Sequence, residues 1–209
     1  MLRSIVLDRL STEQGSFLGS TGSRLLDGNT SVHVNFEVKL RDYYNADAVL
    51  LFNSGYDANI ALFGTLPQEG DVVVHDKLIH ASILDGIRAS RAAKSSHPFD
   101  HNSATSLKSV LQMLMGTYPR IRSGSSTVFV ALETVYSMDG DVAPLRELVE
   151  AVENTLPKGC FQIIVDEAHS TGVFGPAGRG IISYMGLEKR VHICLYTFSK
   201  ALAGSGGKY

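Results

Sequence analysis

The chain has 209 residues, of which 44% are hydrophobic and 19% are charged, so it can bury a substantial core. The formal net charge of -2 provides no basic surface for nucleic acid, and no apolar run approaches the ~20 residues of a membrane-spanning helix. We therefore expect a soluble cytoplasmic protein with no nucleic-acid partner and no membrane span, although Arg3 and Arg9 leave mitochondrial targeting open.

Runs rich in β-branched and aromatic residues alternate along the chain with segments of helical periodicity. In chain order, strands are predicted at 48–52, 71–74, 127–132, 161–165 and 191–196, and helices at 58–66, 103–115 and 144–155. This alternation is typical of βαβ units and predicts an α/β fold with a mainly parallel sheet flanked by helices. The last three predicted strands are almost continuously apolar, as expected for strands covered on both faces.

Polar side chains follow these three apolar runs, at the point where each predicted strand ends. They are Glu133 after the first run, Asp166 and His169 after the second, and Thr197, Ser199 and Lys200 after the third. Because the carboxyl ends of parallel strands meet at one edge of a sheet, we expect these groups to converge on one ligand site.

One short motif resembles that of nucleotide-dependent helicases, but the phosphate-binding loop that such enzymes need is missing. Residues 166–169 spell DEAH, a helicase motif. A helicase also needs a phosphate-binding loop, and in the glycine-rich segment near the end Leu202 and Tyr209 occupy the places of a required glycine and a required hydroxyl residue. The sequence therefore does not support a helicase.

Histidine and carboxylate residues raise the question of a metal site. A zinc site at Asp166, His169 and His80 would have no cysteine ligand, and the sequence contains no HExxH motif. His97 and His101 are four residues apart, but the proline between them disfavours the helix that would align them, so we expect both in loops. We predict no metal site.

Lys200 lies just after an apolar run, among small and hydroxyl residues. This setting suits a lysine that forms a Schiff base with pyridoxal 5'-phosphate, since a desolvated pocket favours the neutral amine. The alternative is a solvated loop lysine, the usual environment of this residue. Asp166 favours the cofactor reading over its own alternative, a buried helix cap, because a carboxylate at the end of a neighbouring strand can pair with the pyridinium nitrogen.

Six blocks, in this order, resemble the α-oxoamine synthases, which are pyridoxal-phosphate enzymes of the class I/II aminotransferase fold. The blocks are SGYDAN at 54–59, HAS with DG between 80 and 86, HN at 101–102, a segment from Glu133 to SMDGD at 137–141, DEAHSTGV with GRG between 166 and 180, and TFSK at 197–200. The resemblance covers about residue 19 to the end, which predicts an N-terminal segment at 1–18 and an incomplete pyridoxal-phosphate-binding large domain at 19–209.

The resemblance assigns cofactor contacts to particular residues. It places Ser54, Gly55, Tyr56 and Thr197 at the cofactor phosphate, where a helix N-terminus can bind an anion. It makes Lys200 the Schiff-base lysine and the base that removes the substrate's Cα proton.

Around the cofactor ring, the resemblance implies a second set of contacts. His80 matches the residue that stacks on the ring, Asp166 the partner of the pyridinium nitrogen, and His169 the partner of the phenolic oxygen. Glu133 and Ser137 match further residues of the pocket. Catalytic roles are thus implied for Lys200, His80, Asp166 and His169.

By the same resemblance, the substrates are an amino acid and an acyl-CoA, which condense with loss of carbon dioxide to an α-amino ketone in a homodimeric enzyme. The expected fold is the large domain of fold type I, without the last sheet strand and the C-terminal small domain, so we expect the isolated chain to associate and to be inactive. Two alternatives remain: an aminotransferase or C–S lyase of the same fold, and a catalytically silent subunit or fragment.

Overall fold

The computed structural model describes residues 20 and 22–209, which fall into two compact units, up to Val49 and Leu50–Tyr209. The first unit contains helix α2 (Ser31–Tyr44). Its start is fixed by a capping box, in which the His33 side chain accepts from the Thr30 amide and the Thr30 side chain accepts from the His33 amide. Asn45 ends the helix in the left-handed conformation. The predicted boundary after residue 18 lies outside the described residues and stays a prediction.

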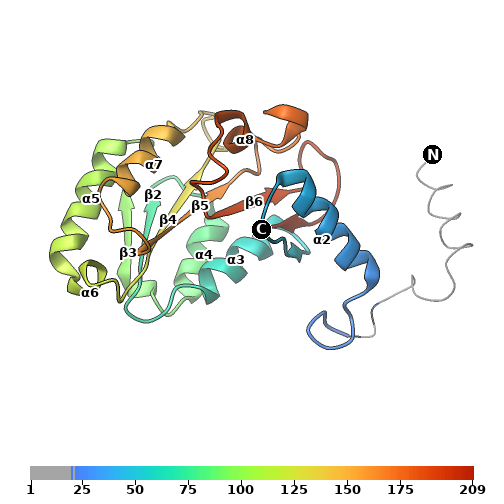
Figure 1. Ribbon diagram of the computed structural model, residues 1–209, viewed down its shortest axis with the longest axis horizontal. Helices are drawn as coiled ribbons and strands as arrows, with labels where there is room; N and C mark the ends of the chain where they lie inside the picture. The colour runs from blue at the N-terminus through green and yellow to red at the C-terminus, as the bar shows by residue number, and fades with distance from the viewer. Residues whose placement is uncertain (1–19, 21) are drawn as a thin grey trace, which may run out of the picture. The chain divides into compact units, whose positions relative to one another are not determined.

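The second unit is built on a seven-stranded sheet with the order β1-β7-β6-β5-β4-β2-β3 (Figure 1). The strands are β1 (Leu51–Phe52), β2 (Val72–Asp76), β3 (Ser96–Phe99), β4 (Val128–Glu133), β5 (Phe161–Asp166), β6 (Ile193–Thr197) and β7 (Gly207–Lys208). Every pairing among β2 to β6 is parallel, and β7 runs antiparallel to both β1 and β6. The predicted mainly parallel sheet is confirmed.

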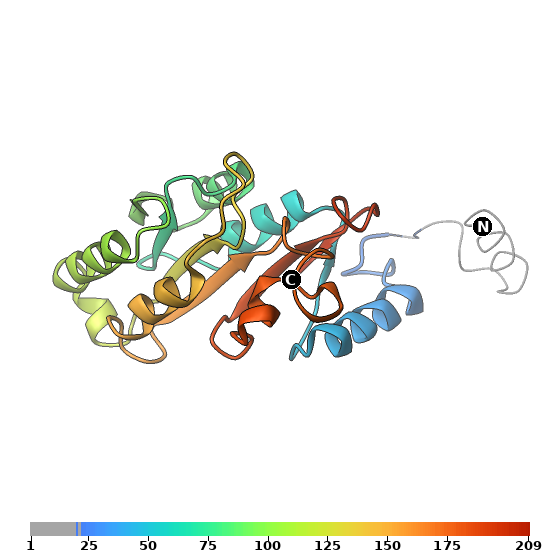
Figure 2. The same cartoon turned by 90° about the horizontal axis from the view of Figure 1, so that it is seen from above.

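Helices cover the sheet on both faces (Figure 2). They are α3 (Gly55–Thr65), α4 (Ala81–Ala89), α5 (Ala104–Thr117), α6 (Pro119–Arg122), α7 (Leu145–Glu153) and α8 (Ile181–Met185), with short 3-10 turns at Ala93–Ser95 and Pro176–Gly178. The helices α3 and α4 pack together on one face, and α5 and α7 pack together on the other. The central strands β2 and β4 are therefore buried along their whole length, as their apolar sequences require.

Gly86 allows α3 and α4 to lie unusually close. A Cβ atom at this position would lie 2.8 Å from the Asn59 carbonyl oxygen and 2.9 Å from the Phe63 Cβ. Contacts this short cannot be accommodated without moving α3, so a glycine is needed at the crossing. The position of Asn59 depends on this contact.

Three expectations from the sequence differ from the structure. Strand β3 was not predicted, and His97, which was expected in a loop, lies within it. Pro98 is tolerated there because β3 is the edge strand, where one donor can be spared. The expectation that the last sheet strand is absent is also wrong, since β7 closes the sheet between β6 and β1.

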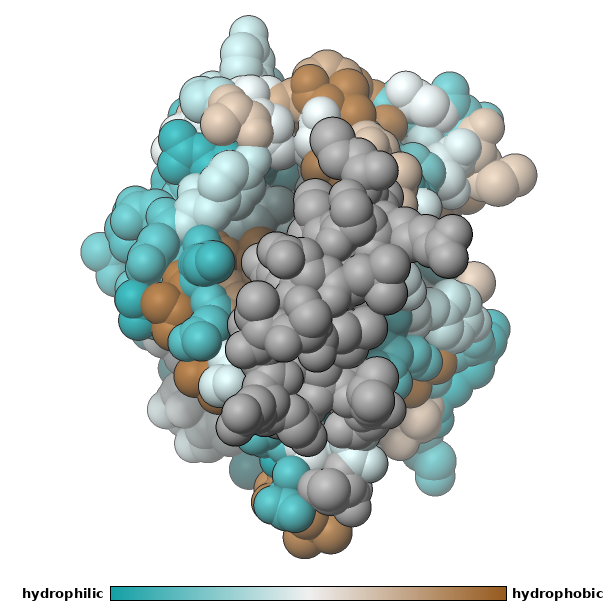
Figure 3. Space-filling model, turned by 90° about the vertical axis from the view of Figure 1, so that its right-hand side faces the viewer, coloured by the Kyte–Doolittle hydropathy of each residue, from teal (hydrophilic) through white to brown (hydrophobic). Residues whose placement is uncertain are grey.

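The surface of the described residues mixes polar and apolar side chains. On the face shown in Figure 3, hydrophilic and hydrophobic residues are interspersed. The exposed large side chains include Met138 and Tyr184, which are 86% and 72% exposed. The described helices lie between Ser31 and Met185. None of these helices has both the length and the hydropathy that a membrane crossing requires.

Candidate active site

A pocket opens where β4, β5 and β6 end and where α3 and α4 begin. Of the residues predicted for the site, it is lined by Ser54, Gly55, Tyr56, His80, Glu133, Asp166, His169, Thr197 and Lys200, together with Asn59, Ser82, Ala168, Leu195 and Ser199. The predicted convergence of polar groups at one edge of the sheet is confirmed. Ser137 does not line this pocket and is exposed.

The N-terminus of α3 forms one wall of the pocket. Ser54 caps the helix, because its Oγ accepts a hydrogen bond of 2.9 Å from the Asp57 amide. A Cβ atom on Gly55 would lie 3.3 Å from Thr197, and one on Gly207 would lie 2.7 Å from the Gly55 nitrogen. Two glycines thus let the helix start rest directly on β6 and β7, where its free amides can bind an anion.

Thr197 and Ser199 add hydroxyl groups beside this helix start. Their Oγ atoms lie 3.0 Å apart, and both residues line the pocket. Tyr56 is 42% exposed, and its hydroxyl donates to Asp85 Oδ2 at 2.5 Å. The wall therefore combines hydroxyl and amide donors, which is the donor set that a phosphate group requires.

Asp166 lies at the floor of the pocket, at the end of β5, and is buried. Its Oδ1 accepts from the Ala168 amide and its Oδ2 from Asn59 Nδ2, both at 2.9 Å. Burial raises the pKa of Asp166, and the hydrogen bonds from Asn59 and Ala168 oppose that rise. A cation placed beside this carboxylate would therefore be strongly favoured.

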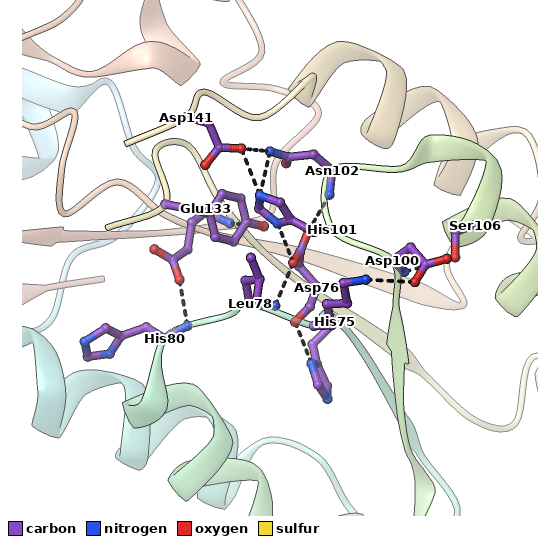
Figure 4. Close-up of polar contacts among 12 residues, drawn as sticks. His75, Asp76, Leu78, His80, Asp100, His101, Asn102, Ser106, Glu133 and Asp141 are labelled. Carbon is purple, nitrogen blue, oxygen red and sulfur yellow. Dashed lines mark hydrogen bonds and ion pairs between the residues drawn. The ribbon is translucent and has the colours of Figure 1, made fainter. Parts of the chain in front are cut away.

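Glu133 ends β4 directly opposite Asp166 in the sheet register. Burial, with the charge of Asp166 beside it, raises the pKa of Glu133 to about 8, so this carboxyl group is protonated at neutral pH. Its Oε1 accepts a hydrogen bond of 2.6 Å from the His80 amide (Figure 4). Glu133 thus fixes the start of α4 and with it the position of His80.

Two histidines line the pocket. The Ser82 amide donates to His80 Nδ1 at 3.2 Å, which leaves the proton on Nε2. Burial and the ammonium of Lys200 lower the pKa of His169. Lys200 itself is exposed, so the desolvated surroundings expected from the sequence are not present around this side chain.

A polar network lies next to the pocket, and sequence reasoning gave it no function (Figure 4). His101 Nδ1 contacts Asp76 Oδ1 and its Nε2 contacts Asp141 Oδ2, both at 2.8 Å. Asn102 donates its backbone amide to Asp76 Oδ2 and its side chain to Asp141 Oδ2. The network joins the end of β2 to the loop after β4. In the sequence it was signalled by the HN block at 101–102 and by Asp141 of the SMDGD block.

Both ring nitrogens of His101 face carboxylates, which stabilise its protonated form. Burial lowers the pKa of His101, but its hydrogen bonds with Asp76 and Asp141 outweigh that effect and raise it above 6.5. The stabilisation is therefore fully present below the unfolded value and is lost as the pH rises through the folded pKa. The pKa of Asp141 is lowered, mainly by His101 against its own desolvation, so its contribution is lost only in acid.

We expect His101→Asn to lower the free energy of unfolding by about 1–3 kcal/mol near pH 6, the range for charged hydrogen bonds, and by less near pH 9. Urea unfolding of the protein that carries this chain, compared at the two pH values, measures the difference. Lys77→Gln is the control, because its ion pair with Asp100 is exposed and should contribute less than about 1 kcal/mol at either pH. An equal loss for His101→Asn at both pH values would contradict the charged state of this histidine.

In the part of the chain that the structure describes, no group of three or more His, Cys, Asp or Glu side chains could hold a metal ion. The pocket instead combines anion donors, a buried carboxylate, an imidazole and an amine.

Comparison with known proteins gives matches over most of the chain. The family model for aminotransferase class I and II matches residues 6–208. An 8-amino-7-oxononanoate synthase from Emericella nidulans is 51% identical over 187 residues, which are 90% of this chain and 45% of that protein. The chain thus spans about half the length of this relative.

Solved structures agree with the fold. The serine palmitoyltransferase of Sphingomonas wittichii superposes with a TM-score of 0.83 at 37% identity, over 99% of this chain and 48% of that one. A high-resolution structure of SPT with a PLP internal aldimine gives the same TM-score of 0.83, identity of 37% and coverage of 99% and 48%.

Proposed function

The chain belongs to the aminotransferase class I and II family, and from that premise we propose that the protein carrying it is a pyridoxal-phosphate-dependent acyltransferase of the α-oxoamine synthase type. It condenses an amino acid with an acyl-CoA and releases carbon dioxide and free CoA, giving an α-amino ketone. The observation that carries the proposal is a pocket beside the N-terminus of α3, in which the buried carboxylate of Asp166 lies together with His80 and Lys200. The names of the relatives support the acyl-transfer assignment.

The donor set of the pocket fits pyridoxal 5'-phosphate. The amides at the start of α3 and the hydroxyls of Ser54 and Thr197 would hold the phosphate. Asp166 would pair with the ring nitrogen, and Lys200 supplies the amine that such a cofactor requires. When bound, the cofactor supplies an electron sink that stabilises negative charge at the substrate's Cα.

The residues of the pocket then have separate tasks. Asp166 keeps a proton on the ring nitrogen, because its buried carboxylate favours an adjacent cation. His80, in the tautomer that Ser82 imposes, would cover the ring face, and His169 would donate to the phenolic oxygen. Lys200 takes the proton from the substrate's Cα as general base. Glu133 holds the start of α4 in place.

A reaction assay distinguishes this function from the alternatives. With cofactor, an amino acid labelled at its carboxyl carbon and a panel of acyl-CoAs, the protein that carries this chain should release CoA thiol and labelled carbon dioxide in equal amounts. Reactions without the amino acid correct for simple thioester hydrolysis. A keto acid formed without thiol would indicate an aminotransferase, and bound cofactor with no turnover would indicate a silent subunit.

The proposal extends to assembly and compartment. We infer a cytoplasmic homodimer, on the resemblance to the α-oxoamine synthases. Size-exclusion chromatography with light scattering tests the dimer.

A further inference from the structure

Asn59 occupies a buried position between the candidate cofactor residues. It lies in the second turn of α3 and is 2% exposed. Its Nδ2 donates to Asp166 Oδ2 and to Ser82 Oγ, both at 2.9 Å. Its Oδ1 accepts from the Tyr209 hydroxyl at 2.6 Å. Both amide hydrogens and the amide oxygen are therefore used.

These contacts determine which way the amide points. If the amide were reversed, its oxygen would face the Asp166 carboxylate, and two acceptors would meet in a buried site. The hydroxyl of Tyr209 secures the observed orientation from the opposite end, because it donates to the amide oxygen. An ionised Asp166 and this orientation of Asn59 thus require each other.

Asp166 depends on few donors. Among the described residues, its carboxylate accepts from one side chain, Asn59, and from one backbone amide, that of Ala168. Burial favours the protonated acid, and each donor opposes it by binding the charged form. Loss of Asn59 would leave a buried oxygen without a partner, which favours protonation of the carboxyl group.

The Asn59 amide is also linked, through Ser82, to His80, the residue proposed to cover the cofactor ring. Ser82 Oγ, which accepts from Asn59, lies 2.7 Å from His80 Nδ1. The serine can therefore accept from the amide and donate to the imidazole, which continues the chain of hydrogen bonds to His80. One side chain on α3 thus couples the carboxylate on β5 to the histidine at the start of α4.

We propose that Asn59 is a positioning residue, which keeps Asp166 ionised and oriented and holds His80 in one tautomer through Ser82. The expected effect of Asn59 on the reaction rests on the proposed function. The expected effect of Asn59 on the protonation of Asp166 does not, because it follows from the hydrogen bonds alone.

The test replaces Asn59 with leucine, which has a similar size but no polar atoms, in the protein that carries this chain. In the cofactor-free protein, infrared spectroscopy with 13C-labelled aspartate follows protonation of Asp166, assigned by the band lost in Asp166→Asn. The midpoint should rise by at least about one pH unit, the equivalent of one strong hydrogen bond. In the loaded protein, the pH profile of the cofactor's visible absorbance should shift, and kcat should fall at least about tenfold.

Two further variants make the outcome decisive. Phe63→Leu, one turn further along α3, removes core packing without touching the carboxylate. It should lower stability and leave the Asp166 midpoint unchanged. If Asn59→Leu does not fold, Asn59→Ala removes the same donor without added bulk and is expected to give the same shifts.

A folded Asn59 variant with the wild-type carboxyl midpoint and absorbance profile would overturn the inference. Wild-type protein that binds no cofactor or releases no thiol would instead overturn the proposed function, while the infrared measurement on cofactor-free protein would still decide the role of Asn59.

Discussion

Replacement of Lys200 by alanine should abolish covalent attachment of pyridoxal 5'-phosphate and leave the fold intact. Lys200 follows β6 and its side chain is exposed, so its loss removes little packing. Borohydride treatment of the loaded wild-type protein should fix the cofactor onto one peptide, which mass spectrometry maps to Lys200. The variant should yield no labelled peptide, and its free energy of unfolding should change by less than about 0.5 kcal/mol.

Lys208 provides the matched control for this experiment. It is a buried lysine of β7 whose ammonium lies 4.2 Å from the centre of the Tyr196 ring. Burial lowers the pKa of Lys208 to about 7, so a large share of its amine is neutral and nucleophilic at neutral pH. It does not line the pocket, however, and Lys208→Met should retain the label. A label on Lys208 in the wild-type protein would contradict the assignment of Lys200.

The central part of the fold could be predicted because its strands carry strong signals. The apolar runs that become β4, β5 and β6 are long enough to be recognised, and the residue after each run lies at the edge where the pocket forms. The strand predicted at 48–52 forms only over its last two residues, as β1. The strand β7 is two residues long, so no periodicity can identify it. Proline and histidine in β3 suggest a loop until its edge position is known.

The candidate site was partly predictable for a similar reason. Residues at strand ends can be placed from local patterns, whereas Asn59 meets Asp166 across 107 positions of sequence, through a crossing that only Gly86 permits. Protonation states were not accessible either. The high pKa of Glu133 arises from burial and from its register opposite Asp166, and neither is visible in the chain. Glu167 of the DEAH motif is structural, since it accepts from the Ser170 hydroxyl and the Ile182 amide.

Asp166→Asn should preserve cofactor binding but remove most of the catalytic rate. The start of α3, the Thr197 hydroxyl and Lys200 are unchanged in this variant, so on the proposed function the protein should still load. An amide carries no charge and cannot hold a proton on the ring nitrogen, so the cofactor loses its capacity to accept electrons. We expect kcat to fall by more than about tenfold, which corresponds to ~1.4 kcal/mol of activation free energy. Steady-state thiol release by the loaded protein measures this.

Two consequences distinguish loss of charge at Asp166 from general damage. The carboxylate receives donors at both oxygens, from Ala168 and Asn59, and an amide offers only one oxygen, so stability should fall by about 1–3 kcal/mol. Removal of the charge should also lower the pKa of Glu133 from about 8, because Asp166 contributes to raising it.

Asp76→Asn is the control for this experiment. It removes another buried carboxylate, which lies outside the pocket, and it should lower stability while the cofactor absorbance is retained. A loss in kcat of less than about tenfold for Asp166→Asn would show that this carboxylate does not hold the ring proton.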